Sequence, residues 1–404
     1  MKQTLYTNLI FWTLSILLIG VVVGSASALF LVTLDLATAT RTSSDFWILL
    51  LPLGGAIIGI GYHYLAKGVE KESNLLISEM IEPKHRIHWK LAPIVMVGTV
   101  LTHLLGGSAG REGTAVQMGG AIADQFGTLF KRANLNRKIL LRMGVAAGFA
   151  GVFGTPIAGV LFAFELDRKI KLDVQGFTPI ILVSILADYA CQLWGVEHTS
   201  YAAVQLPDVS FTSIGFVLII AVVFGLTAMV FSLSKKYLTS GLKQYMPNDI
   251  LRISLGGGLI ALVALIFNFQ SYLGLGIPII EEAFTAESGL EVFAIKVLFT
   301  VFTLSVGFKG GEATPLFFIG ATLGSALAMF VPLPTSFLAG LGFIAVFAGA
   351  TNSPLACAAM GMEMFGPTGG LWYLLVCVIA FYISGKTTVY SAQSVHLFKY
   401  NLRS

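Results

Sequence analysis

The most informative stretch of this sequence is Gly-Arg-Glu-Gly-Thr at 110–114, which interrupts an otherwise apolar part of the chain. A second interruption, Gly-Gly-Glu-Ala-Thr-Pro, stands at 310–315. Each places one carboxylate, Glu112 or Glu312, beside glycines at the predicted start of a helix. An ionisable side chain at membrane depth is energetically costly and by default marks a functional site. The two motifs together therefore predict transport.

The composition places the chain among polytopic membrane proteins. Of its 404 residues, 56% are hydrophobic and 11% are charged, whereas a soluble globular domain is about 25% charged. Residues 3–34 carry no charge, and one spanning helix needs only about 20 residues. Further apolar runs lie at 46–66, 91–107, 139–164, 176–194, 211–233, 253–270, 292–307, 316–331, 336–362 and 371–385. We therefore expect residues 1–404 to form a single transmembrane transport domain, without a cytoplasmic regulatory domain.

Net charge and cysteine content argue against two other classes of protein. A net charge of +4 over 404 residues is too small and too scattered to predict a nucleic-acid partner. The three cysteines lie in apolar runs without metal-ligand spacing, so neither a disulfide framework nor a zinc site is predicted. No motif for a nucleotide or another cofactor is present, and no cofactor is expected.

The chain contains an internal repeat. The stretch AGVFGTPIAGVLFAFEL at 150–166 matches AGATNSPLACAAMGMEM at 348–364 at an offset of 198, with a shared proline and a shared glutamate. The glutamate motifs repeat in the same order at an offset of 200. These offsets predict a duplicated unit, with one repeat at about 1–200 and the other at about 205–404.

Basic residues indicate that the second repeat is inverted in the membrane. In the first repeat, the loops at 131–138 and 168–171 carry Lys and Arg, which predicts that they are cytoplasmic. The equivalent loops of the second repeat, at 331–336 and 366–370, carry neither. Equivalent loops are therefore expected on opposite faces, an arrangement that places the site of many secondary transporters between the repeats near the midplane.

The glycine-rich breaks are suited to binding an anion. A helix N-terminus presents unpaired backbone N–H groups and about half a positive charge. Two such ends that converge from the two repeats would form a site for a small anion without a lysine, whose buried charge would hold the ion too tightly for release. An ionised Glu112 or Glu312 competes with the anion for these donors, whereas a protonated one withdraws. Proton binding and anion binding are thereby linked.

The two motifs, together with GVFGTPIAGVLFAFE at 151–165, resemble the CLC family of anion channels and anion/proton antiporters. The order and spacing of the resemblance cover essentially the whole chain. It implies an all-α polytopic membrane protein with a CLC-type fold, in which two inverted-topology repeats are built from tilted and broken helices. It also implies a homodimer with one pore in each subunit.

Four departures from the family's usual motifs resemble its fluoride/proton antiporter branch, CLC-F. Glu-Ser-Asn-Leu at 72–75 replaces Gly-Ser-Gly-Ile-Pro, Thr114 replaces the proline of Gly-Lys/Arg-Glu-Gly-Pro, and Ala313 replaces the phenylalanine of Gly-x-Phe-x-Pro. Chloride/proton exchangers that resemble this chain carry a Glu-Glu pair where Glu165-Leu166 stands here. Their internal proton acceptor is thus missing, which argues against a chloride/proton exchanger of that design.

The resemblance also implies roles for individual residues. Glu112 would be the gating glutamate, with Glu312, Thr314 and Tyr390 along the ion path and Asn74 at the inner selectivity position. Fluoride is small and strongly hydrated, and amide and hydroxyl groups can replace its water with short hydrogen bonds. The other residues predicted to form the pathway are Gly110, Arg111, Gly113, Thr114, Gly311 and Ala313.

These features predict an exporter of cytosolic fluoride in exchange for protons, which acts in the inner membrane of a prokaryotic cell and gives fluoride resistance. Its expected partners are fluoride, protons and membrane lipid. A passive anion channel or a chloride-selective exchanger of the same fold is the alternative prediction, because fold does not dictate coupling. A membrane enzyme with Glu112 and Glu312 as an acid/base pair is not expected, because no nucleophile or metal cluster accompanies them.

Purely structural roles are the alternative for the same glutamates. Glu112 has Arg111 beside it, and Glu312 has Lys309 three residues before it, so an ion pair is the structural alternative for either carboxylate. Two further glutamates at predicted helix ends are assigned to structure or to interface snorkelling rather than to transport, Glu165 and Glu363.

Overall fold

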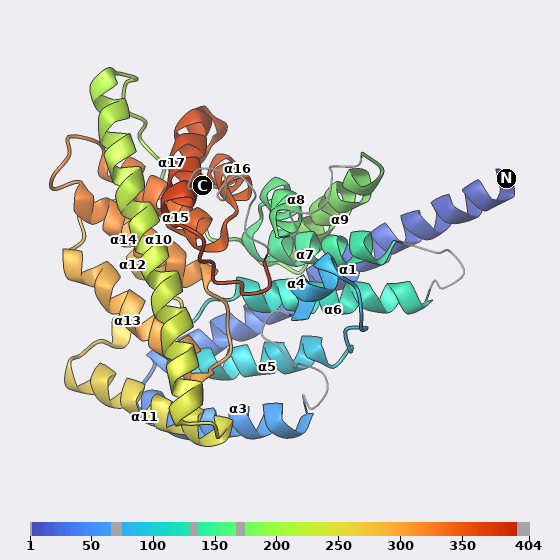
Figure 1. The fold of residues 1–404 in the computed structure, drawn as a ribbon, viewed down its shortest axis with the longest axis horizontal. Helices are drawn as coiled ribbons and strands as arrows, with labels where there is room; N and C mark the ends of the chain where they lie inside the picture. Colours follow the sequence, from blue (N-terminus) through green and yellow to red (C-terminus); the bar gives the residue numbers. More distant parts are fainter. Residues whose placement is uncertain (1, 66–74, 130–135, 167–173, 394–404) are drawn as a thin grey trace.

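A computed structural model describes residues 2–65, 75–129, 136–166 and 174–393. Helices dominate these residues, as expected (Figure 1). The seventeen α-helices in the described part of the chain are α1 (Lys2–Thr42), α2 (Phe46–Leu49), α3 (Leu51–Leu65), α4 (Leu75–Ile81), α5 (Leu91–Leu104), α6 (Glu112–Leu129), α7 (Arg137–Phe153), α8 (Pro156–Glu165), α9 (Val174–Leu193), α10 (Phe211–Tyr245), α11 (Asp249–Ile266), α12 (Ile277–Ala283), α13 (Leu290–Val306), α14 (Ala313–Leu327), α15 (Thr335–Thr351), α16 (Pro354–Phe365) and α17 (Gly370–Ile383). Short 3₁₀ helices, η2 (Gln270–Tyr272) and η3 (Pro367–Gly369), connect some of them.

Two apolar runs that sequence analysis treats as continuous, 139–164 and 336–362, are each broken into two helices. The breaks precede Pro156 and Pro354, which begin α8 and α16. Proline lacks a backbone N–H and disfavours helical geometry at the residue before it, so it begins a helix far better than it continues one. The residues that follow α7 and α15, Gly154 and Asn352, each lie two positions before the proline. Both have left-handed backbone angles, with φ of 69° and 56°.

The same order of helices occurs twice, which confirms the predicted fold class. A helix that follows a glutamate motif, α6 or α14, packs against a long buried helix, α7 or α15, and a short proline-initiated helix, α8 or α16, comes next. In Figure 1, α4 to α9 lie to the right and the helices from α12 onward to the left, α10 crosses in front, and α3 lies at the bottom beside α11. The position of the boundary between the repeats stays a prediction.

A close crossing of two helices recurs in each half. A Cβ atom on Gly119 of α6 would lie 2.1 Å from the carbonyl oxygen of Gly144 in α7. In the second half, a Cβ on Gly320 of α14 would lie 2.0 Å from the carbonyl oxygen of Gly342 in α15. The backbones are therefore in direct contact, as small residues allow where helices associate without a large hydrophobic gain. Any side chain at these four positions would force the helices apart.

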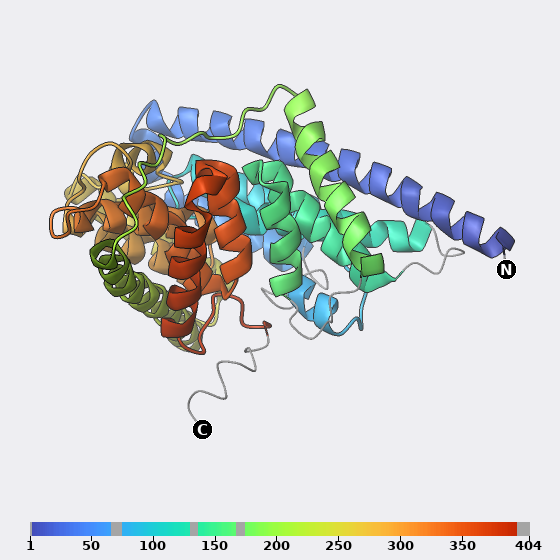
Figure 2. The same cartoon turned by 90° about the horizontal axis from the view of Figure 1, so that it is seen from above.

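Long helices with apolar exposed faces surround this centre. Four described helices or parts of helices are long and apolar enough to cross a membrane: Ile10–Thr42, Gly176–Leu193, Phe211–Tyr245 and Asp249–Ile266. The first of them, within α1, runs the length of the molecule beside α5, α6, α7 and α9 (Figure 2). Large apolar side chains are exposed along these helices, such as Leu29, Leu36, Ile219 and Val230. Such a surface is typical of a chain that faces lipid rather than water.

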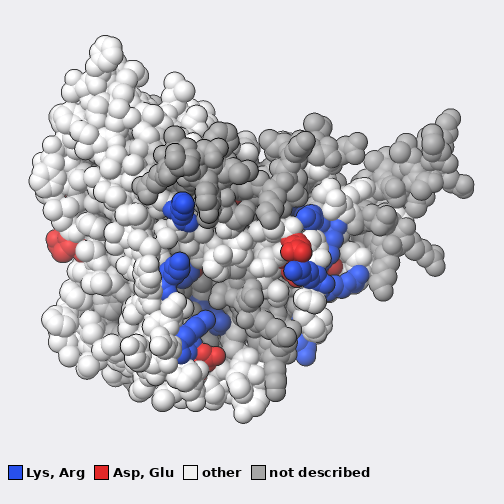
Figure 3. Space-filling model, in the orientation of Figure 1, with Lys and Arg blue, Asp and Glu red and all other residues white. Residues whose placement is uncertain are grey.

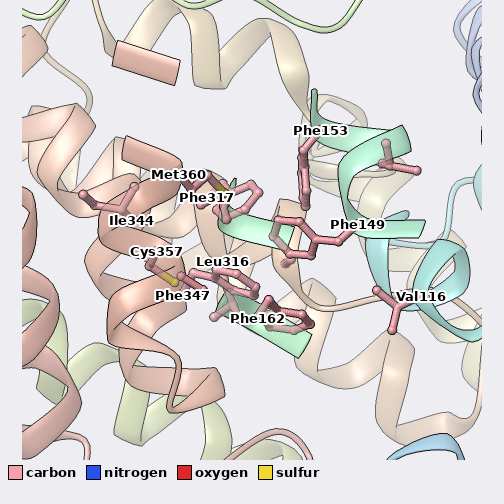
Figure 4. Packing of buried hydrophobic residues seen from close by; sticks show 14 of the residues in the cluster. Val116, Phe149, Phe153, Phe162, Leu316, Phe317, Ile344, Phe347, Cys357 and Met360 are labelled. Carbon is pink, nitrogen blue, oxygen red and sulfur yellow. The ribbon is translucent and has the colours of Figure 1, made fainter. Parts of the chain in front are cut away.

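Aromatic rings fill the interior between the two halves. Phe149 of α7 lies 4.8 Å from Phe162 of α8, and Phe162 lies 6.1 Å from Phe347 of α15, measured between ring centroids. Phe317 of α14 stacks on Phe343 of α15 at 4.1 Å. Figure 4 shows these phenylalanines, apart from Phe343, projecting toward one another from helices of both halves. The two repeats are thus joined by one continuous apolar core.

A reciprocal pair of carboxylate caps also joins the halves. Glu363, near the end of α16, accepts backbone N–H bonds from Ile157 and Ala158 at the start of α8, both of 2.8 Å. Glu165, at the end of α8, accepts bonds from Leu355 and Ala356 at the start of α16, of 3.1 and 2.8 Å. Carboxylates at a helix N-terminus satisfy unpaired donors and complement the helix dipole. Both glutamates therefore make structural contacts between the halves, as expected.

We expect Gly144→Val to destabilise the protein because the new side chain would overlap the backbone of α6. Overpacking of this kind costs about 1–3 kcal/mol, and more where only backbone can yield. The melting temperature in detergent should fall by several degrees, as followed by size-exclusion chromatography after heating. Gly215→Val on α10 is the matched control, because no atom lies within 4 Å of its added Cβ. An equal loss in both variants would contradict the backbone contact as the cause.

Candidate functional site

The two glycine-rich breaks meet at the centre of the molecule. Gly110 donates a backbone hydrogen bond of 2.6 Å to the carbonyl oxygen of Gly311, and Gly311 returns one of 2.7 Å. A Cβ atom on Gly311 would lie 2.6 Å from the backbone nitrogen of Gly113. Only glycine permits this approach, so the repeated glycines are explained by contact between the motifs. The starts of α6 and α14 are brought together as predicted.

Glu112 reaches across this junction to the other half. It is the first residue of α6 and is 2% exposed. Its carboxylate accepts a hydrogen bond of 3.1 Å from the backbone N–H of Thr314, in the first turn of α14, and a second from the Thr314 hydroxyl. The carboxylate therefore occupies the N-terminus of α14, where the free N–H groups and the helix dipole favour an anion.

The hydrogen-bond donors to the Glu112 carboxylate are on Thr314 and not on the neighbouring Arg111. Its charge lies within electrostatic range of Glu112 and also of Asp35 on α1. The Arg111 Nε atom has no hydrogen-bond partner among the described residues. Glu112 is thus held by donors of the opposite repeat rather than by a local ion pair alone.

The two motif threonines have different partners. The Thr314 hydroxyl binds Glu112, whereas the Thr114 hydroxyl lies 2.6 Å from that of Thr99 on α5. Thr114 and Thr99 are both buried. The threonine of the first motif therefore fixes α6 to α5, while its counterpart in the second motif contacts the Glu112 carboxylate. Sequence analysis did not identify Thr99, because a threonine within an apolar helix carries no separate signal.

Glu312 forms an ion pair with Lys235 of α10. Lys235 thus brings an ammonium group beside the second motif, where a carboxylate holds it. Sequence analysis missed Lys235 because the apolar run appeared to end at residue 233, whereas α10 continues to Tyr245. The partner considered from sequence, Lys309, has its ammonium 3.8 Å from the centre of the Tyr62 ring.

The remaining predicted pathway residues are placed as follows. Ala313 is buried at the start of α14. Tyr390 follows α17, packs its ring edge-to-face on Phe162 at 6.3 Å, and lies within electrostatic range of both motif glutamates. Asn74, the predicted inner selectivity residue, lies outside the described residues.

Comparison with known families decides the classification. The profile of the family described as voltage gated chloride channel matches residues 54–385. The chain belongs to this family, the CLC family. The Glu112 motif, the proline-initiated helices and the Glu312 motif all lie within the matched region. The resemblance inferred from the motifs is therefore confirmed.

Similar CLC proteins include both named and structurally characterised members. The chain is 43% identical over 384 residues to the "Chloride/fluoride channel protein" of Pseudomonas syringae pv. tomato, covering 94% of this chain and 85% of the relative. It is 26% identical over 343 residues to the "H(+)/Cl(-) exchange transporter ClcA" of Cronobacter sakazakii, covering 79% and 72%.

Solved structures of this CLC fold match over almost the whole chain. The crystal structure of a CLC-type fluoride/proton antiporter superposes with a TM-score of 0.92 at 34% identity, covering 97% of this chain and 99% of the other. A slow cyanobacterial Cl⁻/H⁺ antiporter superposes with a TM-score of 0.82 at 20% identity, covering 94% and 96%. The second likeness shows the fold alone.

We expect Thr314→Val to shift the pH dependence of anion flux upward. Valine keeps the shape and the backbone donor but removes the hydroxyl, which binds only the ionised form of Glu112 strongly. A hydrogen bond to a charged group is worth about 1.5–3 kcal/mol, so the shift should be about one pH unit or more. Flux into liposomes measured across pH would test this. Thr314→Ser should restore the profile, and Thr114→Val should leave it unshifted; equal shifts in both valine variants would contradict the assignment.

Proposed function

We propose that this CLC protein is a fluoride/proton antiporter that exports cytosolic fluoride and gives fluoride resistance. The observation that carries the proposal is the Glu112 carboxylate on the N-terminus of α14, held by the amide and hydroxyl of Thr314. The similarity to a CLC-type fluoride/proton antiporter, at 34% identity over 97% of the chain, supports the choice of ion and of coupling.

Exchange follows from competition for one set of donors. In the ionised state Glu112 holds the Thr314 donors, so an incoming anion has no place at the start of α14. When a proton neutralises the carboxylate, its acceptor strength falls and the side chain leaves, which frees both donors for fluoride. Release of the proton on the other side returns the carboxylate to the donors and displaces the fluoride. Because the returning carboxylate and the fluoride compete for the same donors, the proton flux and the fluoride flux are coupled.

Hydroxyl donors at this site suit fluoride in particular. A small ion with high charge density gives up strongly bound water, and short charge-assisted hydrogen bonds compensate best for that loss. Thr314 supplies a hydroxyl and an amide from one residue, and Tyr390 adds a phenol near both glutamates. Fluoride enters cells as neutral HF and is trapped as the anion at cytosolic pH, so export driven by proton entry opposes the trap.

The orientation and assembly of the protein are part of the proposal. Lys and Arg side chains gather over α4 and over the lower part of α10 on the face drawn in Figure 3. By the positive-inside rule this face is cytoplasmic, and the protein is a multi-pass component of a prokaryotic inner membrane. Ile157 and Leu355, exposed at the capped ends of α8 and α16, provide an apolar surface for a second copy in a homodimer embedded in lipid.

A chloride-conducting function is the second candidate. The "Chloride/fluoride channel protein" of Pseudomonas, 43% identical to this chain, is named for both ions and as a channel. A passive anion channel or a chloride-selective exchanger would use the same helix N-terminus.

Efflux from liposomes that contain the purified protein separates these functions. Fluoride and chloride are loaded in turn, and the external pH is recorded with each ion. We expect fluoride efflux to drive proton uptake into the vesicles, with little chloride flux. Rapid flux of both halides without proton movement would make the protein a channel, and proton uptake with chloride alone would make it a chloride exchanger.

We expect Glu112→Gln to abolish fluoride-driven proton movement. Glutamine keeps the size of the side chain but cannot exchange a proton, so coupled proton flux should fall about hundredfold or more. The measurement is proton uptake during fluoride efflux from liposomes. Glu82→Gln is the matched control, because the side chain of Glu82 is 72% exposed and pairs only with Lys84 at the surface. Unchanged coupling in Glu112→Gln would remove this residue from the mechanism.

A further inference from the structure

Lys235 is a basic residue inside an apolar helix, next to the second motif. It lies ten residues before the end of α10 and forms an ion pair with Glu312, with side chains 20% and 12% exposed. Its ammonium also lies 3.5 Å from the carbonyl oxygen of Val389, the residue before Tyr390. Lys235 therefore connects α10, the start of α14 and the segment that carries the predicted pathway tyrosine.

The backbone around Lys235 is anchored to the same part of the molecule. Ser305 of α13 donates its hydroxyl to the Lys235 carbonyl oxygen at 3.4 Å and accepts a bond of 3.1 Å from Thr239, one turn further along α10. Val389 in turn donates its backbone N–H to Ala350 of α15 at 2.9 Å. The position of the ammonium is thus set by contacts that do not involve Glu312.

The two motif glutamates are used differently although they occupy equivalent places. Glu112 places its carboxylate on the start of the opposite helix, whereas Glu312 makes no side-chain cap at α14 and turns to Lys235. The offset of 200 residues that relates the glutamates also relates Lys235 to Asp35, which lies within electrostatic range of Arg111. Each half therefore has a charged residue on its long helix that faces an opposite charge in its motif.

The charge of the lysine orients the Glu312 carboxylate. An opposite charge in contact attracts a carboxylate, whereas a like charge repels it. Lys235 supplies the opposite charge, and Glu112 is the like charge across the junction. The other titratable groups at this place are Tyr390, within electrostatic range of both glutamates, and Lys309, three residues before Glu312.

We propose that Lys235 is a positioning residue that holds the Glu312 carboxylate turned toward α10, and thereby sets the pH dependence and proton coupling of transport. The inference rests on the proposed function. While the pair is closed, the Glu312 carboxylate keeps clear of the donors that Glu112 and fluoride exchange. Without Lys235, this arrangement of Glu312 is lost.

The test compares Lys235→Met, Glu312→Gln and the double variant in the fluoride and pH assay with liposomes. If the lysine acts through Glu312, each single variant should lower the proton-to-fluoride ratio by about tenfold, as expected for a broken buried pair, and the double variant should be no worse. Lys235→Arg should restore the ratio and the pH profile. Lys236→Met, at an exposed neighbouring position on α10, should behave as the unsubstituted protein.

Several outcomes would overturn the inference without touching the proposed function. Normal coupling in Lys235→Met, or losses that multiply in the double variant, would show that the lysine does not act through Glu312. If Lys235→Met does not fold, a folded double variant with the behaviour of Glu312→Gln supports the inference, and an unfolded double variant overturns it. Absence of coupling in the unsubstituted protein would instead reject the proposed function.

Discussion

The structure depends on the direct backbone contact between Gly110 and Gly311. Two hydrogen bonds between residues of different repeats hold two helix starts together at the centre of the chain. Each start brings unpaired N–H donors and a partial positive charge. A Cβ on either glycine would meet backbone or carboxylate atoms within 3.0 Å, so the contact exists only with glycine. Everything proposed for ion binding follows from this convergence, because it concentrates donors at one place.

Two positive helix ends that converge require negative charge nearby, and the two motif glutamates supply it in different ways. Glu112 places its charge directly on the start of α14. Glu312 directs its charge away, to Lys235. Equivalent residues of the two halves have thus taken different partners, and in the proposed mechanism only the Glu112 carboxylate exchanges with an anion. A symmetric arrangement would place two carboxylates on the same donors and leave no room for the transported ion.

Sequence was sufficient for the features that depend on local chemistry. The apolar runs predicted a polytopic membrane protein, the glycines around each glutamate predicted that two helix starts converge, and the resemblance carried by the motifs implied the fold class. The breaks before Pro156 and Pro354 fall within runs that the sequence analysis took as continuous. It was insufficient where a contact depends on how far a helix continues. Lys235 was assigned no role because lysine usually ends an apolar span, whereas here the helix continues for ten more residues. The partner of Thr114 was hidden for a related reason, since only packing decides which helix faces its hydroxyl.

The same interaction, a carboxylate on a helix N-terminus, serves both the fixed frame and the exchangeable site. Glu165 and Glu363 lie at or near the ends of helices and cap each other's helix reciprocally, so neither can leave without freeing two donors and losing the pairing of α8 with α16. Glu112 stands instead at the start of α6, where its carboxylate lies against Gly110, a residue without a side chain. In the proposed mechanism its departure exposes donors that an anion can satisfy. The proposed gate therefore differs from a structural cap in what replaces the carboxylate, not in the chemistry of the bond.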